Sequence, residues 1–342
     1  MPSFYDDWLA AADEIEARFR SSPGVARDAD RPWESTRQDA RVKLLLADEL
    51  GFPMMGGAVM KAEIPVGWHT GRHRHGEEAV HVVEGTGFIL LEGHRFDVRP
   101  GSTLHVPYRA QHQLVNTGAE PLTYVSALAF PLERFVKLAR MEQLEDCGPN
   151  DDRLLATQPD TGAVLPSGRR VIIHLDEAPT DPGADDESSR IEAYQKQHYL
   201  TRYLFPKRNG DAPYSVVMTH VFEEPPGYHG GRHKHLEAVL YVIDGEGYSD
   251  VGDKPERWSA GDALHVPPAM YEHAHYNHGV RTSRMLRIQF GIRQWFTEIW
   301  PEGYTPQRVY DAEGAPVQAG WIDPAREAAE RAAAGKAGVQ RE

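Results

Sequence analysis

The chain carries one segment twice, and this internal repeat constrains its fold more than any other feature. Residues 67–75 read GWHTGRHRH and residues 227–235 read GYHGGRHKH, with six of the nine positions identical at a shift of 160 residues. The same shift aligns LHVP at 104–107 with LHVP at 264–267. A repeat at one fixed offset indicates that a single structural unit occurs twice. A chain of 342 residues has room for two ordinary domains, so we expect one unit in each half.

Each copy has the composition of antiparallel β-structure. Short runs rich in Val, Ile, Leu and Tyr are interrupted by Gly, Asp and Pro, which is typical of strands joined by tight turns. The segments AVHVVEGTGFILLEGHRFDV at 79–98 and AVLYVIDGEGYSDV at 238–251 each read as strand, turn and strand. We therefore predict an all-β dominated protein with one antiparallel β domain in each half and flanking helices. The helical patterns lie at residues 5–19, 132–145, 292–300 and 324–339.

The domain boundaries are predicted from one polar stretch. The segment TDPGADDESS at 180–189 is acidic and contains Pro and Gly, as expected of a linker or exposed loop. We place the N-terminal domain and its helix at 1–150, a linker or loop region at 151–190, the C-terminal domain at 191–320, and a helical tail at 321–342.

Charge and hydropathy exclude several classes of function. The chain has 37 basic and 51 acidic residues, a net charge of −14, whereas binding to nucleic acid requires clustered Lys and Arg. No apolar run approaches the ~18 residues of a transmembrane helix, and the acidic N-terminus does not resemble a secretory signal. The single cysteine, Cys147, fits a reducing compartment. We predict a cytoplasmic protein without a nucleic-acid or membrane partner.

The repeated histidines predict two metal sites. Side chains alternate between the faces of a strand, so His73, His75 and Glu77 point the same way. Two imidazoles and a carboxylate on one face suit a divalent ion such as Fe, Mn, Ni or Zn. A lone histidine is usually a structural or surface residue, but the recurrence of the whole pattern favours metal binding. The predicted ligands are His73, His75 and His112 in the first copy and His233, His235 and His273 in the second.

The identity of a carboxylate ligand stays open at this stage. Glu77 and Glu237 are candidate metal ligands or acid–base groups, and His275 is a further candidate. Strand alternation would turn Glu78 to the opposite face. The histidines alone predict a three-histidine site.

These residues resemble the two motifs of the cupin superfamily, and the resemblance covers both halves of the chain. The first motif has a glycine, an HxH pair, a glutamate and a closing glycine; the second runs from glycine through proline to histidine and asparagine. The matching residues are Gly67, Gly85, Gly101, Pro107, His112 and Asn116 in the first half, and Gly227, Gly245, Gly261, Pro267, His273 and Asn277 in the second. The resemblance implies jelly-roll barrels with a metal inside. In the family the glutamate usually follows the second histidine after three or four residues, whereas Glu77 and Glu237 follow after one.

Within that superfamily, the HRH segment and the sequence from His273 through His275 to Asn277 resemble gentisate-type and salicylate-type ring-cleaving dioxygenases. That resemblance implies Fe(II) held by three histidines without a carboxylate ligand, mainly in the N-terminal barrel. Here both halves keep their histidines, which leaves open whether one or both are active.

Neighbouring residues are candidates for binding substrate or for orienting the ligands. Arg72 and Arg232 have the planar fork that binds a carboxylate, although alternation also favours an outward salt bridge for both. The candidate pocket residues are Arg72, His81, Arg109, Gln111, Gln113, Arg232 and Tyr241. The candidates for holding the ligand imidazoles in one tautomer are His69, His105, Asn116, His229, His265 and Asn277.

Three functions are compatible with these residues. The first is an Fe(II)-dependent dioxygenase that acts on a hydroxylated aromatic acid or a related chelating acid and on O₂. The second is a lyase, decarboxylase or isomerase that uses Mn, Ni or Zn without O₂. The third is a non-catalytic protein that binds a small molecule. We also expect a homo-oligomer.

Overall fold

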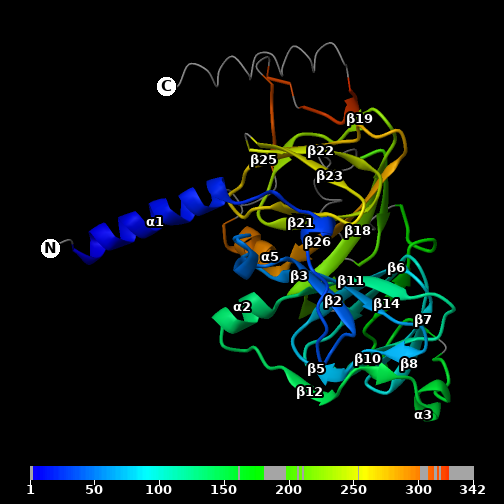
Figure 1. Cartoon of the computed structure of the whole chain (residues 1–342). Coiled ribbons are helices and arrows are strands. Elements are labelled where there is room, and N and C mark those ends of the chain that lie inside the picture. The colour runs from blue at the N-terminus through cyan, green and yellow to red at the C-terminus, as the bar shows by residue number, and fades with distance from the viewer. Residues whose placement is uncertain are drawn as a thin grey trace.

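Two similar β-barrels make up the chain, one above the other in Figure 1. The computed structural model describes residues 3–160, 162–180, 198–205, 208–209, 212–252, 254–300, 307–311, 314–315 and 317–322. The helix predicted at 324–339 and most of the polar stretch at 180–189 lie outside the described residues. The prediction of an all-β dominated fold with two barrel domains is confirmed.

The N-terminal barrel consists of two antiparallel sheets around an apolar interior that includes Val80, Ile89 and Leu104. The order of its six-stranded sheet is β14 (Ile172–His174), β9 (Ser102–Val106), β6 (Glu78–Glu84), β11 (Leu122–Leu128), β3 (Ala58–Ile64) and β2 (Arg41–Leu46). The other sheet contains β12 (Glu142–Glu145), β5 (Arg72–Arg74), β10 (His112–Asn116), β4 (Trp68–His69), β13 (Gly148–Pro149), β7 (Gly87–Leu91) and β8 (His94–Val98).

The C-terminal barrel repeats this arrangement. The order of its six-stranded sheet is β1 (Val25–Ala26), β24 (Ala263–Val266), β21 (Ala238–Asp244), β26 (Ser283–Phe290), β18 (Val216–Glu224) and β15 (Leu200–Tyr203). The facing sheet contains β23 (Lys254–Ser259), β22 (Glu246–Val251), β25 (Glu272–Tyr276), β19 (Tyr228–His229), β28 (Gly320–Trp321), β20 (His233–Lys234) and β27 (Gln307–Arg308). A separate short pair is formed by β16 (Arg208–Asn209) and β17 (Ala212–Pro213).

Both predicted strand–turn–strand segments are present, but the strands on either side of Gly85 and of Gly245 do not pair with each other, whereas β7 and β8 farther along the first segment do. Strand β6 belongs to one sheet and β7 to the other, so the chain crosses between sheets at Gly85. Gly85 has φ +81°, and a Cβ there would lie 2.5 Å from the carbonyl oxygen of Pro121. Only glycine accommodates both the left-handed backbone and this close approach. Gly245, with φ +90°, is the equivalent residue in the second barrel.

The helices agree with the sequence at two places and differ at one. The patterns at 5–19 and 292–300 correspond to α1 (Phe4–Ser21) and α5 (Gly291–Ile299). The helix predicted at 132–145 is wrong, because α2 (Phe130–Phe135) ends before Lys137, which has φ +61°, and strand β12 follows. The shorter elements are α3 (Asp152–Leu155), η1 (Asp28–Asp30) and η2 (Asp48–Leu50). Among the described residues, no helix is both long enough and apolar enough to cross a membrane.

The two barrels exchange strands at equivalent positions. Strand β1 precedes the N-terminal barrel in sequence but pairs with β24 of the C-terminal barrel, with Val25 opposite Leu264. Strand β14 precedes the C-terminal barrel but pairs with β9 of the N-terminal barrel, with Ile172 opposite Leu104. The described part of 151–190, predicted as a linker, therefore contributes a strand to the N-terminal sheet. The edge of the N-terminal sheet supplies hydrogen-bond partners for the backbone of this strand, so its apolar side chains can be buried.

An apolar layer joins the two six-stranded sheets. Buried side chains from both sheets, such as Val125 and Ala127 on one side and Val239 and Leu286 on the other, belong to one continuous cluster. Each six-stranded sheet is thus covered on both faces, by its own barrel interior and by the other barrel. Burial on both faces explains why these strands read as nearly continuous apolar runs.

Two glutamates connect the barrels reciprocally, and we call this arrangement the interdomain clamp. Glu77 of the N-terminal barrel accepts hydrogen bonds from the backbone amide of Ser215 and from its hydroxyl at 2.8 Å. Glu237 of the C-terminal barrel accepts from the backbone amides of Met55 at 2.8 Å and Gly56 at 2.6 Å. Positions 55 and 215 are 160 residues apart, so the two halves of the clamp are related by the same repeat.

We expect Glu237→Gln to destabilise the protein by about 2–3 kcal/mol, because the glutamine amide nitrogen accepts no hydrogen bond and one of the two buried backbone N–H groups loses its acceptor. Urea unfolding at constant pH measures the change. Glu49→Gln, which alters an exposed ion pair 3.9 Å long, is the control and should change the free energy of unfolding by less than about 0.5 kcal/mol. Equal effects of both variants would contradict the clamp.

Candidate metal centres

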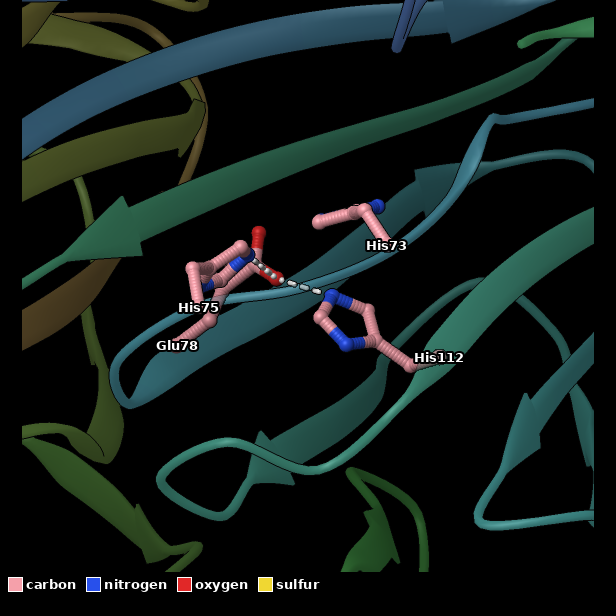
Figure 2. Close-up of side chains that lie close together, drawn as sticks. All are labelled: His73, His75, Glu78 and His112. Carbon is pink, nitrogen blue, oxygen red and sulfur yellow. Dashed lines mark hydrogen bonds and ion pairs between the residues drawn. The ribbon is translucent and has the colours of Figure 1, made fainter. Parts of the chain in front are cut away.

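The first centre lies inside the N-terminal barrel, where four buried side chains converge (Figure 2). His73 on β5 and His112 on β10 are direct cross-strand partners. His75 follows β5, and Glu78 begins β6. One ligand atom from each of the four lies within 4.8 Å of the others. The structure therefore brings the three predicted histidines together and adds a carboxylate.

Backbone carbonyls orient the imidazoles of this centre. Each of the three rings donates its Nδ1–H to a carbonyl oxygen no more than two residues away. The bonds are His73 to Gly71 at 3.2 Å, His75 to Gly76 at 3.0 Å, and His112 to Ala110 at 2.9 Å. Because Nδ1 carries the proton, Nε2 keeps its lone pair for a metal ion.

Glu78 provides the fourth ligand position. Its Oε2 lies 3.0 Å from Nε2 of His112 and 3.5 Å from Nε2 of His75, while the Ser126 hydroxyl donates to Oε1. Burial raises the pKa of the Glu78 carboxyl, but the imidazoles of His112 and His75 outweigh this effect and hold the pKa well below its usual range. A carboxylate beside three imidazole nitrogens is a donor set that fits a divalent cation.

The placement of the two neighbouring glutamates corrects the prediction from strand alternation. Alternation holds only within a continuous strand, and the chain leaves β5 after Arg74 and begins β6 at Glu78. The bend at Gly76 changes the phase, so Glu78 points into the barrel and Glu77 points toward the other barrel. Gly76 is tightly enclosed, since a Cβ there would lie 1.8 Å from a carboxylate oxygen of Glu133. Glu77 and Glu237 are therefore clamp residues and do not join either centre.

The second centre contains His233, His235 and His273, all buried. His233 and His273 are cross-strand partners, as in the first barrel. Their Nδ1 atoms donate to the carbonyls of Gly231 and Tyr271, each at 2.8 Å, and His235 donates to Leu236. With both Nδ1 atoms protonated, Nε2 of His235 and Nε2 of His273 face each other at 3.1 Å as two lone pairs. A shared cation would relieve this repulsion, so the residues fit a metal ion.

Burial lowers the pKa of four of the six ligand histidines, whereas at His75 the hydrogen bond and charge of Glu78 outweigh burial and raise the pKa. Burial lowers the pKa of His73 to about 2 and that of His233 to about 4, and it holds the pKa values of His235 and His273 well below the usual range. Neutral imidazole is the form that binds metal, so these rings need lose no proton at neutral pH.

The two centres differ at two equivalent positions. Ala238 occupies the place of Glu78, and Arg287 occupies the place of Ser126, since β6 pairs with β11 as β21 pairs with β26. The anionic Glu78–Ser126 pair of the first barrel is thus replaced by a small side chain and a cation. The second centre has three histidines and no carboxylate among the described residues.

A cavity of about 60 Å³ adjoins the second centre. Apolar side chains such as Phe222, Leu240 and Val266 form part of its wall. The polar side chains that line it beside the three ligands are His198, Thr201, Tyr203, Thr219, His220, His275, Arg287 and Gln289. A concave site with a few converging polar groups has the form of a site for a small molecule.

A buried acid–imidazole pair stands at this cavity. Glu224 has no exposed surface, and its Oε1 lies 3.1 Å from Nδ1 of His198. Burial raises the pKa of Glu224 well above its usual range and lowers the pKa of His198 well below it. Burial thus favours the neutral form of both groups, a carboxylic acid hydrogen-bonded to a neutral imidazole.

The predicted pocket arginines form outward ion pairs. Arg72 lies 3.2 Å from Glu145, Arg109 lies 3.2 Å from Glu142, and Arg232 lies 3.7 Å from Glu272. Arg72, Gln111 and Gln113 also line an outer cleft of about 200 Å³ together with His112. Their role in binding substrate stays a prediction.

His81 and Tyr241 do not line a barrel interior, contrary to the sequence analysis. Tyr241 belongs to the apolar layer between the barrels. His81 lies on the same face of its strand as Ala79, which is part of that layer. The Nδ1 atom of His81 is 2.8 Å from the Thr103 hydroxyl. The phase change at the bend before β6 and β21 explains both errors.

The residues predicted to orient the ligands have other partners. His105 and His265 lie 3.8 Å and 3.0 Å from the clamp residues Glu77 and Glu237. Asn116 and Asn277 donate to backbone carbonyls of nearby loops. The remaining pairs are His69 with Gln113 and His229 with the Gly230 carbonyl. His275, a candidate ligand or acid–base group, is not one of the three clustered histidines; it lines the cavity and lies 2.8 Å from the Ser249 hydroxyl.

Sequence reasoning missed Glu78, His198, His220, Glu224, Arg287 and Gln289. One signal was available for two of them: the repeat aligns Glu78 with Ala238, and Ser126 with Arg287 once the shift becomes 161 residues. Positions where two otherwise similar copies differ in charge mark where their chemistry has diverged. For His198 and Glu224 the sequence carries no comparable signal, because their proximity depends on the pairing of β15 with β18.

We expect two metal ions per chain, with His75→Ala and His235→Ala each removing one and the double variant removing both. Mass spectrometry of the metal content measures the stoichiometry for chains purified under identical conditions. His94→Ala, which changes a half-buried histidine outside both centres, is the control and should keep both ions. An unchanged metal content in either single variant would refute the assignment of that centre.

A buried acid near the first centre predicts a pH dependence of stability. Asp39 accepts a hydrogen bond from the Tyr124 hydroxyl at 2.6 Å, and burial raises its pKa from 3.8 to about 7. Between these values the folded protein holds a proton that the unfolded chain has lost, so this group makes stability fall as pH rises from about 4 to 7. Asp39→Asn should reduce this loss of unfolding free energy between pH 4 and pH 7 by roughly 1–3 kcal/mol. Urea unfolding at several pH values measures it, and a slope equal to that of the wild type would contradict the assignment.

Comparisons with known proteins agree with the repeat. A model of the cupin domain matches the chain twice, at residues 60–128 and at 220–288. An uncharacterized protein of Methanocaldococcus jannaschii is 34% identical over 67 residues, which are 19% of this chain and 54% of that protein. An acireductone dioxygenase of Yarrowia lipolytica is 48% identical over 40 residues, which are 10% of this chain and 23% of that enzyme. The chain thus spans about half or less of these two relatives.

Two solved structures share the fold over most of the chain. Salicylate 1,2-dioxygenase from Pseudaminobacter salicylatoxidans is 16% identical, with a TM-score of 0.52 over 72% of this chain and 73% of that one. A mutant of Bacillus subtilis oxalate decarboxylase is 14% identical, with a TM-score of 0.60 over 82% of this chain and 84% of that one. At these identities the likeness concerns the fold alone. With a cupin domain in each half and two barrels related by one repeat, the chain is a bicupin of the cupin superfamily.

Proposed function

We propose that this bicupin is an Fe(II)-dependent dioxygenase whose C-terminal barrel binds a chelating acid and O₂. The observation that carries the proposal is the three-histidine centre, which has no carboxylate among the residues that the structure describes and opens on a cavity that contains Arg287. Three neutral ligands leave a divalent ion with positions for an external anion and a gas. The similarity to two proteins named as dioxygenases supports the same class.

The size of the cavity limits which acids it can hold as substrates. A volume of about 60 Å³ holds a few water molecules or a short acid that chelates through two oxygens. A ring-bearing acid such as a hydroxybenzoate would require the cavity to widen. We therefore favour a short hydroxy or keto acid within the broader class of chelating acids.

The side chains of the cavity have separable roles in this proposal. Arg287 and Gln289 bind the carboxylate of the acid, because a guanidinium and an amide donate to its oxygens. Phe222, Leu240 and Val266 exclude water and thereby strengthen that contact. The Glu224–His198 pair stores a proton that His198 can deliver at the cavity wall. Bound Fe(II) would supply the electrons that activate O₂.

The N-terminal centre has a different role in this proposal. Glu78 adds an anionic ligand, which would compete with the carboxylate of an external acid for the metal ion. Apolar side chains fill the barrel interior and leave little space for such an acid. We assign this centre to stabilising its barrel.

A redox-neutral reaction, such as decarboxylation with Mn, is the second candidate. The observation that favours it is the protonated Glu224–His198 pair, since protonation of a carbanion is the step that completes a decarboxylation. One of the structures that share the fold is a decarboxylase.

O₂ uptake separates the two candidates. The chain is loaded under argon with Fe(II) or, in a parallel sample, with Mn(II), and each sample is then assayed under argon and under O₂ with a panel of hydroxy acids, keto acids, oxalate and hydroxybenzoates. We expect uptake with one class of acid, its loss in His235→Ala, and its retention in His75→Ala. Turnover under argon would favour the redox-neutral reaction, and no turnover under either condition would refute both.

We expect Arg287→Gln to raise the KM for the acid at least tenfold while the metal content stays unchanged, because the variant keeps a polar side chain but loses the charge. Steady-state kinetics and metal analysis measure both quantities. Arg284→Gln is the matched control on the same strand, where the side chain pairs with Glu223 at 3.0 Å outside the cavity. Equal effects in the two variants would show that Arg287 does not bind the carboxylate.

A further inference from the structure

Helix α1 stands apart from the two barrels. Figure 1 shows it extending away from the body, with its N-terminal end farthest from both barrels. None of its 18 residues is buried. The contacts at its C-terminal end hold its direction: Arg18 pairs with Asp48 at 2.7 Å, and Lys254 donates to the carbonyls of Arg20 and Ser22. At 1.5 Å per residue the helix is about 27 Å long, so most of its length faces solvent.

The exposed surface of α1 is amphipathic. Phe4, Trp8 and Ile15 recur at helical spacing and leave 67%, 66% and 56% of their surfaces exposed. Ala10 and Ala17 lie on the opposite face. Five acidic residues and no basic ones occur between positions 3 and 17, which gives this part a charge of −5. A helix of this length is marginal in water without tertiary packing, so its aromatic face indicates a partner.

Residues 134–141, which we call the basic segment, have the complementary properties. The segment reads RFVKLARM, with a charge of +3 in a chain whose net charge is −14. Phe135, Leu138 and Met141 are 84%, 58% and 61% exposed. Tyr108 anchors the segment to the barrel through the Leu138 carbonyl at 2.8 Å. The segment thus presents a fixed apolar surface flanked by cations.

The geometry prevents the helix from covering the basic segment of its own chain. Asp48 of η2 binds the C-terminal end of α1, and the adjacent Glu49 lies 3.9 Å from Arg134 at the start of the basic segment. The base of α1 is therefore near this segment, while the aromatic turns point away from it. Figure 1 shows α1 and α2 on the same side of the body. The α1 helix of a second copy can pack on the basic segment, which the α1 helix of the same chain does not reach.

We propose that α1 is an exchanged arm, which packs its aromatic face on the basic segment of a second copy of this chain. In a two-fold dimer each copy gives one arm and receives one, so both acidic helices and both basic segments are covered. The acidic residues Asp7 and Glu14 then flank Lys137 and Arg140 of the other copy. This inference is independent of the proposed reaction.

Light scattering coupled to size exclusion tests the arm with the full chain at micromolar concentration. We expect twice the mass of one chain for the wild type and the mass of one chain for the double variant Trp8→Lys with Ile15→Lys. The matched control, Ala10→Lys with Ala17→Lys, adds the same charges on the opposite face and should remain a dimer. Because α1 buries no residue, none of these variants should change the metal content.

A charge exchange tests the partner surface. Asp7→Lys with Glu14→Lys, and separately Lys137→Glu with Arg140→Glu, should each weaken dimerisation at least tenfold. All four substitutions together should restore the dissociation constant to within about threefold. A monomeric wild type, a dimer insensitive to Trp8→Lys with Ile15→Lys, or a failure of the combined variant to restore dimerisation would each overturn the proposal.

Discussion

The break between the HxH strand and the strand that follows it governs both the metal centres and the interface between the barrels. Within a continuous strand, alternation would place His75 and Glu77 on one face. The bend at Gly76 interrupts the strand and changes its phase, so Glu78 points inward to the imidazoles and Glu77 points outward to Ser215. One three-residue bend thus places adjacent carboxylates on opposite sides of the same sheet. The second barrel repeats the bend, and Glu237 binds the first barrel in return.

The same scaffold supports two different electrostatic environments. In the N-terminal barrel Glu78 neutralises part of the charge of an ion, and apolar side chains fill the interior. In the C-terminal barrel Ala238 leaves space where that carboxylate would stand, and Arg287 brings a positive charge to the cavity. A cation beside a metal ion is costly in a low-dielectric interior unless an anion joins them. This constraint directs the second barrel toward an external acid, whereas the first barrel supplies its own anion.

Local patterns predicted well those features that depend on local geometry. The six histidines, both strand–turn–strand segments and helices α1 and α5 follow from periodicity and repetition. The errors share one cause, which is that a local pattern was extended across a change of direction. His81 and Tyr241 were assigned to the interior by counting through a bend, and the helix at 132–145 was extended past Lys137, where the backbone turns left-handed. Strand β14 was read as linker because its partner, β9, is distant in sequence.

The sequence by itself determined that one unit occurs twice, that each unit is antiparallel β-structure, and which histidines gather in it, because identity at a fixed offset and alternation along a strand are properties of the chain alone. Only the tertiary structure decided that Glu78 and not Glu77 joins the imidazoles, that Glu77 and Glu237 join the barrels, and that Arg287 reaches the second cavity. These facts depend on the direction of a side chain after a bend and on contacts between distant strands. Long-range packing, which spacing along the chain does not encode, fixes both the side-chain directions and these contacts.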